Sequence, residues 1–485
     1  MTATHIERED KFDVEAHFAV PDVADLLAPG AEVRTSSQRL VSYYFDTADL
    51  DLLRAGLTLR RRTGTADSGW QLKVPHKPAR EEIRLADKGR PVPAELRSLL
   101  LGVSRGHPLK QVAKLTTERS VHRLQDVDGD LLAEIDDDTV HASAGGAALT
   151  VTGWREVKVE LGSGDEDLLA ALGQRLRKAG ARPSTASSKL ARLLLGPTAA
   201  QARQARCAAD AVVAYITEQQ CTLVAGDLAL RRQQDDVIHQ TRVAARRLRS
   251  TLRTFGNLFE PDRATALDGE LRWWAGLLGE VRDRQVLRDR LDRLVDELPE
   301  ELALGPVRTR IHTELGREHT EHWQRLQEET AGERYLGLLE SLASWVAEPP
   351  LTSMAEKPVS RLPKMVERAE RKVTRRLSQA NASADVDDLH RARKAAKRAR
   401  YAAELIEPVT GGKAAHKLAR RYQGLQDLLG EHQDSLVSAA LLRRLGGKAG
   451  TTRGENGFSF GLMYEREMQR ASAVRDQARR EAAKS

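Results

Sequence analysis

Residues 5–12 read HIEREDKF, and charged side chains alternate along this predicted β-strand. Glu7, Glu9 and Lys11 fall on one face, because successive side chains of a strand point to opposite sides. The alternation recurs in later segments: LTLRRRTG (57–64), WQLKVP (70–75), REEIR (80–84), RSVHR (119–123), AEIDDD (133–138) and REVKVEL (155–161). The pattern predicts an N-terminal antiparallel β-structure with one strongly charged face.

This charged face allows two interpretations. In an ordinary antiparallel sheet it would face water, and the charges would carry no function. In a closed barrel of eight strands it would line a wet interior, and helices such as residues 168–180 would cover the apolar outer face. The grouping of charges by strand favours the barrel, because clustered acids can hold Mg²⁺ or Mn²⁺ and clustered bases can hold phosphate oxygens. Such a tunnel would bind a metal–triphosphate complex.

The remaining residues, 208–483, read as helices with apolar side chains three and four positions apart. HQTRVAARRLRSTL (239–252) aligns without a gap on HRARKAAKRARYAA (390–403), and at the same offset LLGEVRDRQV (277–286) aligns on LLGEHQDSLV (428–437). We interpret these matches as an internal duplication. The predicted domains are residues 1–197, a linker at 198–207, and residues 208–483 with halves at about 208–348 and 362–483.

One helix of each repeat carries a stripe of basic side chains, and neither stretch, 238–257 or 390–402, contains an acid. A plain solvated surface is the alternative, but like charges four residues apart repel by a few tenths of a kcal/mol per pair, which a bound polyanion would offset. Residues 1–200 hold 28 Lys and Arg against 29 Asp and Glu, whereas the whole chain holds 77 against 70, so the basic excess lies in the helical part.

The two histidine-led basic helices and the LLGE segments resemble the CHAD family, the conserved histidine α-helical domain. The resemblance implies two pseudo-symmetric helical bundles around a basic channel that binds inorganic polyphosphate. Nucleic acid is not expected as the main ligand, because aromatic side chains are scarce near the stripes and no helix-turn-helix or RNA-binding motif is evident. The implied polyphosphate-binding residues are His239, Arg242, Arg246, Arg249, His390, Arg393, Lys397, Arg400 and Lys417.

The strand part resembles a second family, CYTH, also called the triphosphate tunnel metalloenzymes. The resemblance rests on Glu7-x-Glu9-x-Lys11, on residues 43–62, WQLKVP and the acidic strand that ends at Asp138, and on WREVKVEL and SSKLARLL (187–194). It implies an eight-stranded antiparallel tunnel, a requirement for Mg²⁺ or Mn²⁺, and action on triphosphates. No Walker A loop is present, so a P-loop enzyme is not expected.

Carried over residue by residue, the CYTH resemblance gives the tunnel three sets of candidate residues. The catalytic set is Glu7, Glu9 and Lys11, and the metal ligands are Glu7, Glu9, Glu134, Asp136 and Glu160. The substrate phosphates would contact Arg60, Arg62, Lys73, Lys114, Arg119 and Lys189. The late strand of the family usually alternates three acids, and here its middle position is Lys158. That departure weakens or removes one metal site.

We therefore expect a multidomain α+β protein, with an eight-stranded antiparallel tunnel flanked by helices followed by an all-α domain of two helical bundles. The leading hypothesis is a metal-dependent triphosphatase acting on inorganic triphosphate or a related triphosphate, coupled to polyphosphate binding. The alternative is a non-catalytic protein that binds polyphosphate granules. No stretch of eighteen apolar residues predicts a membrane helix, so we expect a cytoplasmic protein without a membrane partner.

Overall fold

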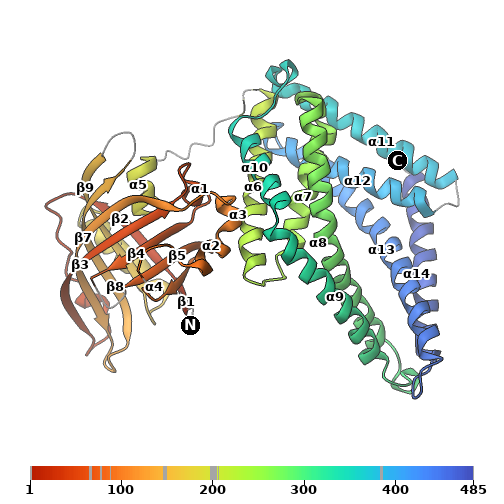
Figure 1. Cartoon of the computed structure of the whole chain (residues 1–485), viewed down its shortest axis with the longest axis horizontal. Helices are drawn as coiled ribbons and strands as arrows, with labels where there is room; N and C mark the ends of the chain where they lie inside the picture. Colours follow the sequence, from red (N-terminus) through yellow and green to blue (C-terminus); the bar gives the residue numbers. More distant parts are fainter. Residues whose placement is uncertain are drawn as a thin grey trace. The chain divides into compact units, whose positions relative to one another are not determined.

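The computed structural model describes residues 3–64, 68–76, 79–87, 89–145, 150–196, 205, 207–382 and 386–483, with only the backbone given for Ala3–Glu7, 76, 79–80, 386 and 482–483. The chain forms two compact units, Met1–Ala202 and Arg203–Ser485, here called the N-terminal and C-terminal units (Figure 1). Within the described residues, no helix combines the length and the apolar character needed to cross a bilayer.

The N-terminal unit is built on one antiparallel sheet with the strand order β1-β6-β5-β4-β3-β7-β8-β9-β2-β10. The predicted alternating segments all lie in its strands. The bounds are β1 Ala3–Glu7, β2 Glu9–Val14, β3 Glu32–Asp46, β4 Thr58–Thr63, β5 Gly69–His76, β6 Ala79–Leu85, β7 Lys110–Gln125, β8 Leu131–Ala144, β9 Thr150–Leu161 and β10 Arg182–Pro183. The antiparallel β-structure expected from the sequence is therefore confirmed.

The strand count and the closure differ from the expected eight-stranded closed barrel. The sheet has ten strands in an open order, and no hydrogen-bonded ladder joins its two ends among the described residues. The count rises because the first predicted strand is divided at Arg8: β1 pairs with β6, whereas β2 pairs with β9. Arg8 is therefore the single residue that connects β1, at one end of the strand order, to β2, near the other end. The two-residue strand β10 pairs with the free edge of β2.

Apolar side chains of the sheet pack on helices on both faces. Phe12, Ile135 and Val157 form a core with Leu172 and Leu176 of α4 (Glu166–Lys178). These strand residues are out of phase with the charged positions, so the opposite face is left to the charges. That charged face is partly covered by α5 (Lys189–Leu195), whose Leu190 and Ala191 pack against Tyr44, Leu115 and Val140.

Short helices complete the N-terminal unit: α1 Asp51–Arg54, α2 Ala94–Leu99 and α3 Leu101–Ser104. The C-terminal unit is all-helical, as expected (Figure 1). Its helices are α6 Ala208–Arg231, α7 Ile238–Thr254, α8 Pro261–Asp296, α9 Val307–Ala331, α10 Glu333–Ala347, α11 Leu362–Ala382, α12 Val386–Ile406, α13 Lys413–Ala449 and α14 Phe458–Ala483. The duplicated segments fall on equivalent helices, α7 with α12 and α8 with α13.

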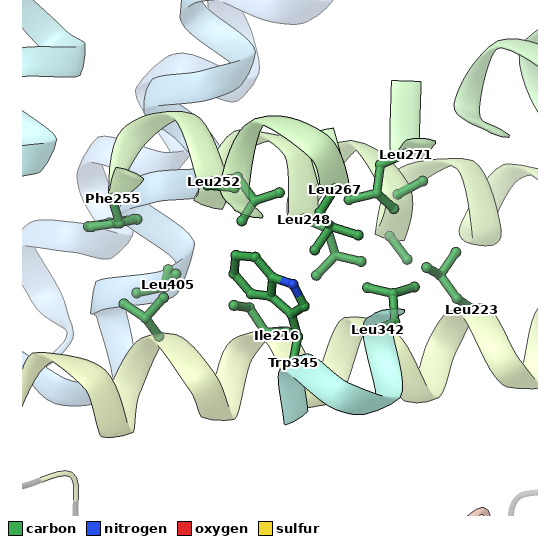
Figure 2. Packing of buried hydrophobic residues seen from close by; sticks show 14 of the residues in the cluster. Ile216, Leu223, Leu248, Leu252, Phe255, Leu267, Leu271, Leu342, Trp345 and Leu405 are labelled. Atoms are coloured by element: carbon green, nitrogen blue, oxygen red, sulfur yellow. The ribbon is translucent and has the colours of Figure 1, made fainter. Parts of the chain in front are cut away.

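The apolar face of α7 fixes the direction of its basic face. Leu248 and Leu252 point into a core around Trp345, together with Ile216 of α6 and Leu405 of α12 (Figure 2). All five side chains are almost fully buried. Because polar and apolar residues occupy opposite sides of an amphipathic helix, the arginines of α7 are directed away from this core.

Candidate phosphate-binding sites

Three neighbouring strands of the N-terminal unit, β2, β9 and β8, bring charged residues together in rows. One row pairs Glu9 with Glu160 and Glu160 with Glu134. The next row pairs Lys11 with Lys158 and Lys158 with Asp136. A third row pairs Glu156 with Asp138, and Asp138 with Arg119 of β7. Directly paired residues are cross-strand neighbours, so the sheet register brings most of the predicted tunnel residues onto one face.

Lys158 lies between two of the predicted metal ligands. Its Nζ is 3.3 Å from Oδ2 of Asp136 and contacts Oε2 of Glu160, and only 13% of its side chain is exposed. Burial would lower the pKa of Lys158, but the carboxylates of Asp136 and Glu160 outweigh burial and raise it. The ammonium group is therefore held in its charged form inside the unit.

Arg119 and Lys189 neutralise the adjacent acids. Arg119 donates through Nε and Nη2 to Asp138 at 2.7 and 2.8 Å, and its Nη1 lies 2.5 Å from Oδ2 of Asp136. Lys189, at the first position of α5, donates to Asp138 at 2.8 Å and also to Glu156. Ser188 caps this helix by accepting from the backbone N–H of Ala191 at 3.0 Å, which positions Lys189.

On the basic strands β4 and β5, unlike on β2, β8 and β9, the cations outnumber the acids near them. Glu82 of β6 is almost fully buried and lies 3.2 Å from Nζ of Lys73 and 3.9 Å from Nη2 of Arg60. Arg62 is only 9% exposed, and no carboxylate pairs with it among the described residues. Its Nε finds no hydrogen-bond acceptor there. Burial, with Arg60 and Arg119 nearby, lowers the pKa of Arg62 to about 9.

Four predicted tunnel residues remain, and the structure treats them in three different ways. Glu9 lies 2.8 Å from Nζ of Lys11, and the nearby cations Lys11, Lys73 and Lys158 outweigh burial and hold the pKa of Glu9 below its ordinary value. The side chain of Glu7 lies outside the described part of the chain. Lys114 must be corrected: it is out of phase with Arg119 on β7, is exposed, and places Nζ 5.8 Å from the ring centre of Tyr43. The sheet separates it from the other phosphate candidates.

A cavity of about 920 Å³ opens on the opposite face of the same sheet. Its lining includes Arg39, Glu118, Asp137 and Arg155, which are out of phase with the tunnel residues, and it also includes Arg119. Arg155 donates to Asp137 at 2.6 and 3.1 Å, so the charges there compensate one another. We therefore place the candidate site on the charged face of the sheet that carries the tunnel residues, around Arg62, Arg119 and Lys158.

In the C-terminal unit, the two histidine-led helices α7 and α12 lie side by side. Ser250 of α7 donates to the carbonyl oxygen of Arg398 at 3.3 Å, and Arg247 pairs with Glu404 of α12 at 2.9 Å. Their basic stripes meet: Arg246 of α7 lies close to Arg393 and Arg400 of α12. The duplication thus joins two moderate stripes into one cluster of cations.

Lys397 is the most perturbed group of this cluster. Burial, with Arg246, Arg393 and Arg242 nearby, lowers its pKa to about 6. Asp434 opposes this shift, but no ion pair of Lys397 or Arg246 with an acid is found in the described part of the chain. His239 and His390, which begin the two stripes, also have a lowered pKa, first because of burial and then because of neighbouring cations.

Two glycines of the LLGE segments support the arginines of the stripes. A Cβ atom at Gly279 would lie 3.1 Å from Nη2 of Arg242, and one at Gly430 would lie 3.0 Å from Nη2 of Arg393. Asp283 accepts from Nη1 of Arg242 at 2.9 Å, and the equivalent Asp434 lies 3.8 Å from Arg393. Each arginine therefore packs flat against a helix backbone beside one carboxylate, in both copies of the repeat.

The outer predicted residues of the stripes are partly neutralised by acids, one on a neighbouring helix and one four residues further along the same helix. Arg249 donates to Asp268 of α8 at 3.1 Å, and Arg400 donates to Glu404 at 2.7 Å. Lys417 is exposed on α13. Sequence reasoning missed these acids and the two glycines, although the repeated Leu-Leu-Gly-Glu was the available signal for the glycines.

Two domain families match the chain. The CYTH domain model matches residues 5–193, and the CHAD domain model matches residues 214–443. The chain belongs to the family of proteins in which a CYTH domain is followed by a CHAD domain. It is 35% identical over 499 residues to the uncharacterized protein Rv2226 of Mycobacterium tuberculosis strain H37Rv, a match that covers 98% of this chain and 95% of that protein.

Two solved structures are similar to part of the chain. PptA from Streptomyces chartreusis is 20% identical, with a TM-score of 0.49 over 57% of this chain and 100% of that one. The CHAD domain from the plant Ricinus communis is also 20% identical, with a TM-score of 0.47 over 57% of this chain and 92% of that one.

CYTH domains generally depend on a divalent metal, so the family implies one in the N-terminal unit. The predicted ligands have suitable chemistry, because carboxylate oxygens are the donors that Mg²⁺ and Mn²⁺ prefer. The placement of the described ligands, a set that leaves out the side chain of Glu7, does not fit, because no three acidic, histidine or cysteine side chains among them converge on one position. Instead, Asp136 and Glu160 share Lys158, and Glu134 accepts from Arg123 at 3.0 Å.

Proposed function

We propose that the N-terminal unit is a triphosphatase, which hydrolyses a phosphoanhydride bond of inorganic triphosphate or a related triphosphate, and that the C-terminal unit binds inorganic polyphosphate. One observation carries the proposal: each unit holds a shielded basic side chain that makes no ion pair among the described residues, the buried Arg62 in the first and the half-buried Lys397 in the second, and burial with neighbouring cations lowers the pKa of both. Burying an unpaired charge is costly, so an anionic ligand that supplies the missing charge stabilises both sites.

In the N-terminal unit, Arg62 would bind the phosphate chain together with Arg60, Lys73, Arg119 and Lys189. Guanidinium and ammonium groups bind phosphate oxygens through charge-assisted hydrogen bonds. Groups fixed before the substrate arrives also stabilise the charge that develops on the bridging oxygen as the bond to phosphorus breaks. Mg²⁺ or Mn²⁺ enters as part of a metal–triphosphate substrate.

In the C-terminal unit, the cluster formed by Arg242, Arg246, Arg393 and Lys397 would bind successive phosphates of a chain. Such a cluster binds through charge and requires no base-stacking side chains, which suits a bare phosphate chain better than nucleic acid. Because both units belong to one polypeptide, a polyphosphate bound to the second would raise the local concentration of chain ends for the first.

A second candidate function is a non-catalytic polyphosphate-binding protein, which would associate with polyphosphate granules. The observation that favours it is the ion pairing of the N-terminal acids, which leaves no described acidic group arranged for a metal. In this case the N-terminal unit would bind phosphate without hydrolysing it.

Phosphate release from inorganic triphosphate by the full chain, with Mg²⁺ or Mn²⁺ supplied, tests the proposal. We expect turnover in the wild type and at least a tenfold loss in Arg62→Ala, with polyphosphate binding unchanged. Lys110→Ala is the matched control, because Lys110 is an exposed cation at the start of β7. Absence of turnover on every triphosphate, with polyphosphate binding retained, would favour the second candidate.

A further inference from the structure

We infer that Lys158 is a fixed cation which takes the place of one divalent metal ion among the acids of the N-terminal unit. The inference deepens the proposed function, because such a unit would bind a triphosphate with fewer protein-held metal ions. It begins from position: Lys158 is the cross-strand neighbour of both Lys11 and Asp136, in the row beside Glu9, Glu160 and Glu134. Acids of β2, β8 and β9 therefore lie near Lys158, together with the cations Lys11 and Arg119.

The contacts of the ammonium group are those of a counter-ion. Nζ lies 3.3 Å from Asp136, contacts Glu160, and is largely shielded from solvent. An ammonium group has three N–H donors, and these two carboxylates account for two of them. No further acceptor for the third is found among the described residues, and this donor would bind an oxygen of a phosphate ligand. A metal ion bridging the same acids would likewise have bound carboxylate and phosphate oxygens together.

The same contacts oppose a metal at this position. Asp136 is fully buried, and its Oδ2 faces both Lys158 and Nη1 of Arg119, at 3.3 and 2.5 Å. A divalent ion needs about six oxygen ligands at 2.0–2.6 Å, so it would have to displace two cations and would also be repelled by them. Lys158 therefore supplies the positive charge that a metal ion would supply, and it occupies the position between Asp136 and Glu160 where that ion would bind.

Mn²⁺ binding to the metal-free full chain, without any phosphate ligand, tests the inference separately from turnover. The number of bound ions is measured from the loss of the free Mn²⁺ signal in electron paramagnetic resonance. We expect Lys158→Glu to bind at least one more Mn²⁺ per chain than the wild type. Lys110→Glu, the same charge change at an exposed site, should match the wild type. Equal numbers in Lys158→Glu and the wild type would overturn the inference.

A second variant, Lys158→Gln, tests the inference even if Lys158→Glu does not fold. Lys158→Gln removes the cation and keeps a side chain of similar length, so Asp136 and Glu160 lose their shared partner. We expect Mn²⁺ to raise the melting temperature of Lys158→Gln by several degrees more than that of the wild type. Equal shifts in the two proteins would contradict the role of Lys158 as a substitute for the metal.

Discussion

Lys397 on α12 lies close to Arg246 on α7, and the two are equivalent residues of the duplicated sequence. The pseudo-symmetry of the C-terminal unit therefore brings two equivalent basic side chains together, and neither makes an ion pair with an acid in the described part of the chain. Arg242 and Arg393 flank this pair as a second equivalent set. A protein that accumulates charge in this way is destabilised unless an anion is bound there.

The depressed pKa of Lys397 predicts that polyphosphate binding takes up protons. With a pKa of about 6, Lys397 is mostly neutral at pH 7.5 in the free protein, and a bound phosphate raises the pKa by favouring the charged form. Affinity should therefore fall as the pH rises above 6, by up to about tenfold per pH unit for one proton. Titration calorimetry at pH 7.5 in buffers of different ionisation enthalpy measures the uptake.

His239 and His390 would also take up protons on binding, so the contribution of Lys397 must be separated. Lys397→Arg provides this separation, because arginine stays charged over the whole range. The variant should take up about one proton fewer than the wild type and show a flatter pH profile. The same proton uptake in both proteins would show that Lys397 is already charged.

Gly279 and Gly430 are expected to control affinity by supporting Arg242 and Arg393. In Gly279→Ala, the new Cβ would lie 3.1 Å from the guanidinium and displace it, and Gly430→Ala would act likewise on Arg393. The double variant should bind polyphosphate several-fold more weakly in a salt-controlled titration. Its helices should not be destabilised, because alanine favours a helix by about 1 kcal/mol over glycine.

Gly276→Ala is the matched control, because a Cβ at Gly276, on the same helix α8, meets no atom within 4 Å. It should bind polyphosphate as the wild type does. If the double variant also binds like the wild type, Arg242 and Arg393 do not need the glycines for their position.

The sequence predicted the elements of this protein better than the pairing of their charges. Alternation along a strand or helix shows which residues share a face, so the antiparallel strands and the basic stripe of each helix were predictable. That the two stripes lie together was implied only by the resemblance to the CHAD family. The alternation does not show which residues of other strands or helices lie against that face. Glu404 and Asp268 neutralise arginines of α7 from other helices, and Lys158 takes up two acids that were expected to bind metal. The division of the first strand at Arg8 could not be predicted for the same reason, because the strands that pair with its two parts come from distant segments of the sequence.

Glu82 is expected to stabilise the N-terminal unit until substrate binds. Glu82→Gln would remove the buried carboxylate that Lys73, Arg84 and Arg60 contact, at a cost of about 3–5 kcal/mol in the free energy of unfolding. Urea denaturation measures the loss, and triphosphate should restore part of it. Glu32→Gln, which breaks an exposed pair with Arg34, should change stability by less than about 1 kcal/mol. Equal effects would contradict the buried role of Glu82.

Arg290 is expected to hold the long helices of the C-terminal unit together. It donates from α8 to Glu467 of α14 at 2.6 Å and to Glu431 of α13 at 2.8 Å, and Glu467 is fully buried. Arg290→Met should cost about 3–5 kcal/mol, because it removes the closest partner of the buried Glu467 and leaves only Arg470, at 3.3 Å. Arg334→Met, which breaks an exposed pair with Glu270, is the control in the same urea denaturation. A loss below about 1 kcal/mol in Arg290→Met would refute this role.

The most direct measurement is a calorimetric comparison of Arg62→Ala and Lys397→Ala, each titrated with triphosphate and with long-chain polyphosphate. If Arg62 and Lys397 bind phosphate in their respective units, Arg62→Ala loses at least tenfold in triphosphate affinity and keeps the high-affinity polyphosphate phase. Lys397→Ala should show the reverse. Wild-type affinity for both ligands in both variants would contradict the assignment of phosphate binding to these two cations.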